Sequence, residues 1–155
     1  MTQEGLLFRL ATRDDLPSIV RMLADDDLGS QREQYEDPLP ESYYSAFEQI
    51  HRDPNHELIV AERTGEVIGT LHLIFLPSVS FQGALRAQVE SVRVDKRFQS
   101  QGIGSQMMKW TMDRAVQRGA QVVQLTTHKS RVDAHRFYER LGFKGSHLAM
   151  KFNLK

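Results

Sequence analysis

The chain has 155 residues, and its 20 lysine and arginine residues are balanced by 20 aspartate and glutamate residues. This zero net charge excludes a global field that would attract nucleic acid or an anionic membrane, so we expect neither as a partner. The absence of cysteine excludes disulfides and cysteine-based nucleophiles or metal sites, and no other cluster of metal-ligating residues stands out in the sequence.

A chain of this length fits one domain, which we predict to span residues 1–155. The first residues lack the basic and apolar regions of a signal peptide. The most apolar stretch, Leu71 to Leu76, is far too short to span a bilayer. We therefore expect a cytoplasmic protein.

The N-terminal part is predicted to hold a strand and two helices. Apolar residues at Ile19–Val20 and Met22–Leu23 indicate the first helix, and Thr12 with Asp15 is typical of its capping box. The acidic run Asp25–Asp27 opposes the helix dipole and predicts the end of that helix. The predicted ranges are 6–11 for the strand, 12–24 for the first helix, 28–40 for a long polar loop and 41–52 for the second helix.

The middle of the chain is typical of antiparallel sheet, with strands predicted at 58–62, 67–75 and 85–94. The apolar side of the third strand changes parity, from odd positions up to Val89 to even positions from Val92. A change of parity inside one strand predicts a β-bulge, here near Glu90 and Ser91.

The last third alternates helix and strand. A helix from about Gly102 to Arg118 is closed by Gly119, and Ser130 or Asp133 is predicted to cap a second helix that Gly142 ends. Strands are predicted at 121–126 and, as a final strand or strand pair, at 143–153. A strand, a glycine-rich turn, a helix and a strand form a βαβ-like unit beside the antiparallel part, which predicts a mixed α/β fold.

The turn Gln99–Ser105, with the sequence QSQGIGS, carries the strongest functional signal. It precedes a predicted helix, and a helix start offers unpaired N–H groups and partial positive charge to a phosphate. The turn lacks the Gly-Lys-Ser/Thr of a P-loop, and the dinucleotide fingerprint requires glycine where Met107 stands. The remaining pattern, Q-x-x-G-x-G, fits an anion site, and it fits equally a turn whose glycines only permit tight packing.

Two segments together resemble the GCN5-related N-acetyltransferase (GNAT) family: the turn with its preceding strand Val89–Asp95, and the later segment Ala134–Phe143. The resemblance covers nearly the whole chain in the order of its elements. It implies a mostly antiparallel twisted sheet with a splayed, bulged strand and about four flanking helices. It also implies an N-acetyltransferase that uses acetyl-CoA (coenzyme A) as its co-substrate.

The resemblance implies a coenzyme A site built from backbone groups. In the family, amides of the turn hold the pyrophosphate, and pantetheine pairs with the bulged strand where it parts from its neighbour. The two valines of this strand can serve in this way and also pack in the core. The corresponding residues here are Val92, Val94, Gln99, Gln101, Gly102, Ile103, Gly104 and Ser105.

The family chemistry, direct attack of an amine on a thioester, implies two catalytic side chains. Tyr138 matches the family tyrosine that protonates the leaving thiolate, although an aromatic residue in such a helix is often part of the core. Glu90 is the candidate base that deprotonates the amine, directly or through water, and a solvent-facing strand glutamate is the alternative. His72 and His128 are further candidates for the base. The Val92 N–H is expected to bind the oxyanion.

Two positions depart from the family pattern. Arg131 stands where an asparagine is frequent, and we expect it to meet a phosphate of the cofactor instead. Ser100 stands where glycine is frequent, which is tolerated if its φ is negative.

The acceptor is expected to contact the first helix–loop–helix, where aspartates and tyrosines suit a cationic amine. A solvated acidic loop is the alternative. A small-molecule amine is favoured over a protein lysine or N-terminus, and a homodimer is the family-level expectation. A non-catalytic acyl-CoA-binding module would keep the turn without needing Glu90 or Tyr138. The candidate acceptor residues are Asp25, Asp26, Asp27, Arg32, Tyr35, Glu36, Tyr43 and Tyr44.

Overall fold

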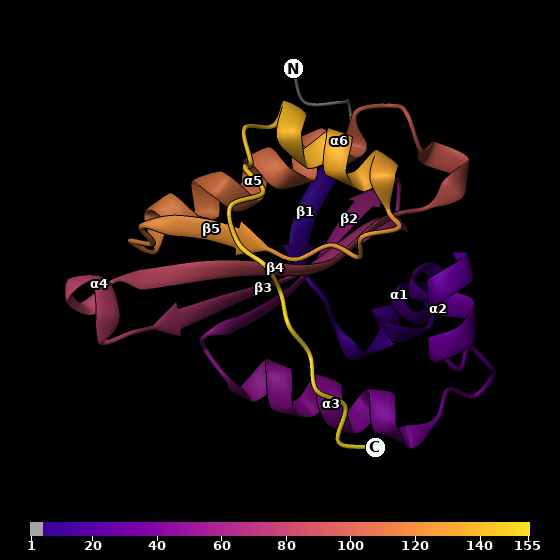
Figure 1. Cartoon of the computed structure of the whole chain (residues 1–155). Helices are drawn as coiled ribbons and strands as arrows, with labels where there is room; N and C mark the ends of the chain where they lie inside the picture. Colours follow the sequence, from indigo (N-terminus) through magenta and orange to yellow (C-terminus); the bar gives the residue numbers. More distant parts are fainter. Residues whose placement is uncertain (1–4) are drawn as a thin grey trace. The chain divides into compact units, whose positions relative to one another are not determined.

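The computed structural model describes residues 5–155 (Figure 1), which fall in two compact units that meet in sequence between Gln124 and Leu125. The single domain therefore stays a prediction. The strands are β1 (Leu6–Leu10), β2 (His56–Arg63), β3 (Glu66–Pro77), β4 (Leu85–Val94) and β5 (Val122–Leu125). The helices are α1 (Leu16–Leu23), α2 (Asp27–Arg32), α3 (Glu41–Arg52), α4 (Ser80–Gly83), α5 (Ile103–Gln117) and α6 (Val132–Arg140), with 3-10 turns η1 (Arg13–Asp15) and η2 (Lys96–Phe98). Within the described residues, no helix is both long and apolar enough to cross a membrane.

The strands form one sheet in the order β1-β2-β3-β4-β5, and the pairs from β1 to β4 are antiparallel. β4 and β5 are joined through α5, the type of crossover that parallel neighbours require. Their starts lie together, because the N–H of Gln121 donates to the carbonyl of Leu85 at 2.9 Å. Further along both strands, Gln124 donates to Gln88. The sheet is therefore mixed, which confirms the predicted α/β class.

Alternation along the strands gives the sheet two different faces. On the face of α5, buried Glu57 accepts from Arg114 at 2.8 Å and Arg118 at 3.1 Å, and Arg118 also lies 4.1 Å from the ring centre of Phe75. On the opposite face, Val60 packs in a core with residues of α1 and α3. Helices α1 and α3 lie on one side of the sheet and α5 lies on the other (Figure 1). The sheet therefore separates a helix α5 layer from an α1–α3 layer.

The predicted bulge lies in β4. Thr70 pairs with Arg93 and His72 pairs with Glu90, so Leu71 alone stands opposite both residues 91 and 92. The extra residue is accommodated by a left-handed backbone, with φ of 56° at Ser91. The change of parity in the sequence therefore identified a real irregularity.

Three predictions about elements were wrong. The first part of the expected loop 28–40 is helical, because Asp26 caps α2 by accepting from the N–H of Gly29 at 2.5 Å. The N-cap of α6 is Arg131, not Ser130 or Asp133. Residues 143–153 form no strand, and apolar residues of this segment such as Leu148 are exposed. An alternating pattern there does not by itself supply the neighbouring strand that a β-strand needs.

A substitution at Gly29 tests the packing at the junction of α1 and α2, residues 23–29, which we call the α1–α2 corner. A Cβ at this position would lie 1.9 Å from the carbonyl oxygen of Leu23, a backbone atom. We expect Gly29→Ala to lower the free energy of unfolding by about 1–3 kcal/mol, since overpacking forces backbone shifts. Gly145→Ala is the control, because its Cβ would meet nothing within 4 Å. Equal urea midpoints for the two variants would contradict the close approach.

Candidate functional site

The turn Gln99–Ser105 leads from η2 into α5. Gly102 is the N-cap of α5 with φ of 81°, and its carbonyl accepts from the N–H of Gln106 at 3.1 Å. The N–H groups of residues 103–105 therefore precede the first hydrogen bond within the helix, and helix geometry gives them no partner inside it. Ile103 is buried and anchors this end of the helix. The turn thus presents backbone donors, as an anion site requires.

The condition under which serine would be tolerated at position 100, a negative φ, is not met. The φ of Ser100 is 63°, in the left-handed region that favours glycine. The chain reverses between η2 and α5, and Ser100 and Gly102 both adopt positive φ to make the reversal. A serine in this conformation costs about 1 kcal/mol or more.

Asp95 fixes the approach to the turn. Its buried carboxylate accepts from the backbone N–H of Arg97 at 3.0 Å and from the Arg97 guanidinium, and it also accepts from Arg21 of α1 at 2.9 Å. Arg97 first, and then Arg21, hold the pKa of Asp95 well below its ordinary range. The loop before the turn is therefore tied to α1. Only the N-cap part of this arrangement, an aspartate directly after a strand, could be recognised from the sequence.

Two of the candidate acceptor residues lie in ion pairs at the same corner. Asp25 lies 3.3 Å from Lys96, and Asp26 lies 3.8 Å from Arg93 of β4. With Arg21–Asp95, these pairs connect the α1–α2 corner to the segment that enters the turn. Their carboxylates are already matched by cations, which weakens the interpretation that they bind a cationic amine.

The other candidate acceptor residues have mixed surroundings. The Tyr43 hydroxyl donates to Glu33 at 3.1 Å and accepts from the N–H of Gln34, and the Tyr44 ring lies 4.2 Å from the guanidinium of Arg13. Arg32 donates to Glu33, and Glu36 accepts from Gln34. Asp27 and Tyr35 are exposed. Contact of any of these with an acceptor stays a prediction.

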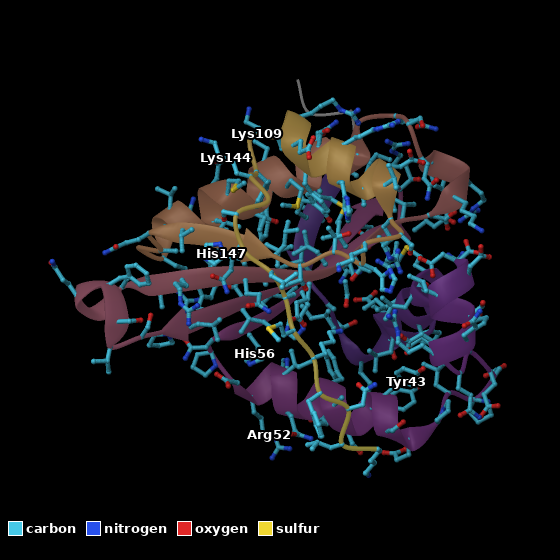
Figure 2. The ribbon with its side chains drawn as sticks, in the orientation of Figure 1. Tyr43, Arg52, His56, Lys109, Lys144 and His147 are labelled. Carbon is cyan, nitrogen blue, oxygen red and sulfur yellow. The ribbon has the colours of Figure 1, made fainter. Side chains whose placement is uncertain are left out.

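Glu90 lies on the α1–α3 face of the sheet, directly opposite His72 of β3. His56 on β2 is labelled in Figure 2. Nε2 of His72 lies 2.9 Å from Nδ1 of His56, and Nε2 of His56 lies 3.8 Å from Asp53. One of the two ring nitrogens in the close contact must carry a proton and the other must accept. Glu90 therefore stands at one end of a histidine pair that leads to the end of α3.

A line of hydrogen bonds reaches Glu90 from its other side. Arg86 donates from Nη1 to Gln124 at 3.5 Å, Gln124 donates to Gln88 at 2.9 Å, and Gln88 donates to Glu90 at 2.7 Å. We call Arg86, Gln124, Gln88 and Glu90 the polar row. It joins β4 to β5, and all its donors point towards the carboxylate.

Tyr138, Arg131 and His128 belong to the second unit. Tyr138 is half-buried in α6, with ring centres of Phe137 at 5.2 Å and Phe143 at 5.7 Å. Arg131 caps α6 beside a cavity of about 350 Å³ lined by residues 130–134. His128 is exposed and bonds Ser130 at 2.7 Å. The expected roles of these residues stay predictions.

Comparison with known proteins identifies the class. Residues 24–143 match the model of the acetyltransferase (GNAT) family. The chain therefore belongs to this family, as the resemblance of its turn and of Ala134–Phe143 implied.

Individual relatives sharpen this result. Aminoalkylphosphonate N-acetyltransferase of Salmonella typhimurium is 40% identical over 98 residues, which cover 61% of this chain and 61% of that protein, so the match spans less than two thirds of the relative. A crystal structure of a transcriptional regulator from Bacillus halodurans C-125 is 50% identical, with a TM-score of 0.93, and covers 96% of this chain and 99% of its own. Glucosamine-6-phosphate N-acetyltransferase from Arabidopsis thaliana shares the fold at 20% identity, with a TM-score of 0.78 over 98% of this chain and 100% of its own.

The histidine pair predicts a pH dependence of stability. Burial, and then His56, lower the pKa of His72 from 6.5 to about 4, against the opposing effect of Glu90. Between these two values the unfolded chain binds the proton and the folded chain does not, so stability falls as pH falls through this range. We expect His72→Gln to remove on the order of 1–3 kcal/mol of this acid-induced loss.

The measurement is urea unfolding at several pH values between 7 and 4. Exposed His147 (Figure 2) provides the control, and His147→Gln should keep the pH slope of the original chain. If His72→Gln and the original chain lose stability in parallel over this range, His72 is not buried in its neutral form.

Proposed function

We propose that this chain transfers the acetyl group of acetyl-CoA to the primary amine of a small molecule by direct attack. The observation that carries this proposal is a bulged β4 followed by a Gly102-capped helix, in a chain of the GNAT family. A bulged strand and a helix start can offer backbone partners to an extended thiol arm and to a pyrophosphate.

The donor site is proposed to be largely backbone. Bound acetyl-CoA supplies the acetyl thioester. The amides of Gln101 to Ser105 bind its pyrophosphate, with Gln99 beside them and Arg131 meeting a phosphate. The backbone of Val92 and Val94 pairs with its pantetheine arm, and the Val92 N–H stabilises the oxyanion.

Glu90 is proposed to deprotonate the acceptor amine, since an ammonium has no lone pair to attack with. The side chain is exposed, and Gln88 holds one of its carboxylate oxygens at 2.7 Å. His72 opposite remains neutral near pH 7, so it does not neutralise the carboxylate. Tyr138 is proposed to protonate the leaving thiolate.

The acceptor is proposed to be a small amine, and the 40% identity to an aminoalkylphosphonate N-acetyltransferase supports this over a protein lysine or N-terminus. A second candidate function is a non-catalytic acyl-CoA-binding module, which is favoured by the 50% identity to a protein described as a transcriptional regulator. Thiol release from acetyl-CoA across a panel of amines separates the two. Acetyl-CoA binding without amine-dependent thiol release would favour the second candidate.

The base and the acid are tested by isosteric changes. We expect Glu90→Gln to lower kcat/KM about 10²-fold near pH 7, with recovery at high pH where more of the amine is already neutral. Tyr138→Phe should lower kcat by about tenfold or more without this recovery. Asp113→Asn, on the exposed side of α5, should leave both constants unchanged. Unchanged turnover in Glu90→Gln and in Tyr138→Phe would overturn these assignments and leave the enzyme class standing.

A further inference from the structure

Arg86 carries a charge that its surroundings do not neutralise. It lies half-buried on β4, and its Nε is buried without a hydrogen-bond partner. Its interaction among the residues that the structure describes is the 3.5 Å contact with the Oε1 of Gln124, and no described carboxylate lies within ion-pair distance. A guanidinium has five donors, and leaving such a group partly buried and unmatched is costly.

Four other half-buried arginines of this unit are matched by carboxylates. Arg114 and Arg118 share Glu57, Arg21 meets Asp95, and Arg9 meets Asp15 at 2.7 Å. Arg63 and Arg93 have a buried Nε as Arg86 does, but Arg93 lies 3.8 Å from Asp26, and the Arg63 guanidinium lies 5.7 Å from the ring centre of Phe98. Arg86 has neither an ion pair with a carboxylate nor a cation–π contact among the residues that the structure describes, which leaves room for an anion from outside the chain.

The position of Arg86 relates it to the proposed base. Residues 86, 88 and 90 alternate onto one face of β4, so Arg86 and Glu90 lie on the same side of the sheet with Gln88 between them. Four residues of strand separate their Cα atoms by about 13 Å, and both side chains extend into this interval. The polar row thus has a cation at one end and a carboxylate at the other.

We propose that Arg86, with Gln124 beside it, binds the anionic group of an acceptor whose amine lies at Glu90. The acceptor class is then an amine that carries an oxyanion on a short chain, such as a phosphonate, a phosphate ester or a carboxylate. The guanidinium fork matches such an oxyanion through two N–H groups. Gln88 and Gln124 line the interval with amides that can turn to either end. The inference rests on the proposed acetyl transfer, because that reaction is what brings the amine to Glu90.

The test compares short primary amines with and without an anionic group. Steady-state thiol release is measured with 2-aminoethylphosphonate, O-phosphoethanolamine, β-alanine and neutral propylamine, for the original chain, Arg86→Gln and Arg86→Lys. We expect Arg86→Gln to raise KM for the preferred anionic amine at least tenfold, to leave propylamine unchanged, and to be partly rescued by Arg86→Lys. The KM values for the three anionic amines show which of phosphonate, phosphate and carboxylate the site prefers. Lys109→Gln, an exposed position of α5 (Figure 2), controls for the loss of one positive charge.

Equal effects of Arg86→Gln on anionic and neutral amines, or no effect on either, would overturn the anion site. If no amine is acetylated, the proposed function fails and the anion site is tested by itself. Ethylphosphonate, which has no amine, is then titrated by calorimetry in the presence of saturating coenzyme A. Binding that Arg86→Gln abolishes supports the site, and absence of binding to the original chain refutes it.

Discussion

The bulge of β4 is the constraint on which the remaining geometry depends. Because Leu71 faces two residues of β4, the apolar side chains keep one orientation before and after the irregularity. Val89 pairs with Leu73 and Val94 with Gly69, so both face α5, whereas Glu90 and Arg93 face the opposite layer. β4 therefore contributes side chains to both faces of the sheet. One side completes the core beneath α5, and the other presents a carboxylate and, through Arg93 and Asp26, a connection to the α1–α2 corner.

Charge organises the two ends of this strand differently. At its C-terminal end, Asp95 and the pairs Asp25–Lys96 and Asp26–Arg93 match each cation with a carboxylate, which fixes the segment that enters the turn. At its N-terminal end, the cation Arg86 is bonded only to an amide among the described residues. The ion pairs at the C-terminal end of β4 make the proposed acetyl-CoA site rigid. The unmatched Arg86 at the N-terminal end of β4 is suited to bind the anionic group of the proposed acceptor. This contrast connects the proposed donor site and the proposed acceptor site along one strand.

The sequence predicted those features that depend on neighbours in the chain. Helix 41–52 and strand 85–94 have the predicted bounds, and the parity of β4 revealed its bulge. Prediction from the sequence failed where one group of residues has two roles and where an element needs a neighbouring strand. The acidic run both ends α1 and caps α2, and the alternation at 143–153 lacks a strand partner. The turn was recognised because its signal is local, whereas the polar row depends on strand register, which brings Gln124 to Gln88 from 36 positions away.

The central claim, that the start of α5 binds the pyrophosphate of acetyl-CoA, is tested most directly by calorimetric titration of acetyl-CoA into Gly102→Asp and Gly119→Asp. Both glycines have similar positive φ, 81° and 83°, and an added Cβ meets nothing within 4 Å at either. The two variants therefore share backbone strain and charge change, but they lie at opposite ends of α5. The account predicts that Gly102→Asp weakens binding about tenfold or more and that Gly119→Asp binds as the original chain does. Equal affinity of the two variants would contradict it.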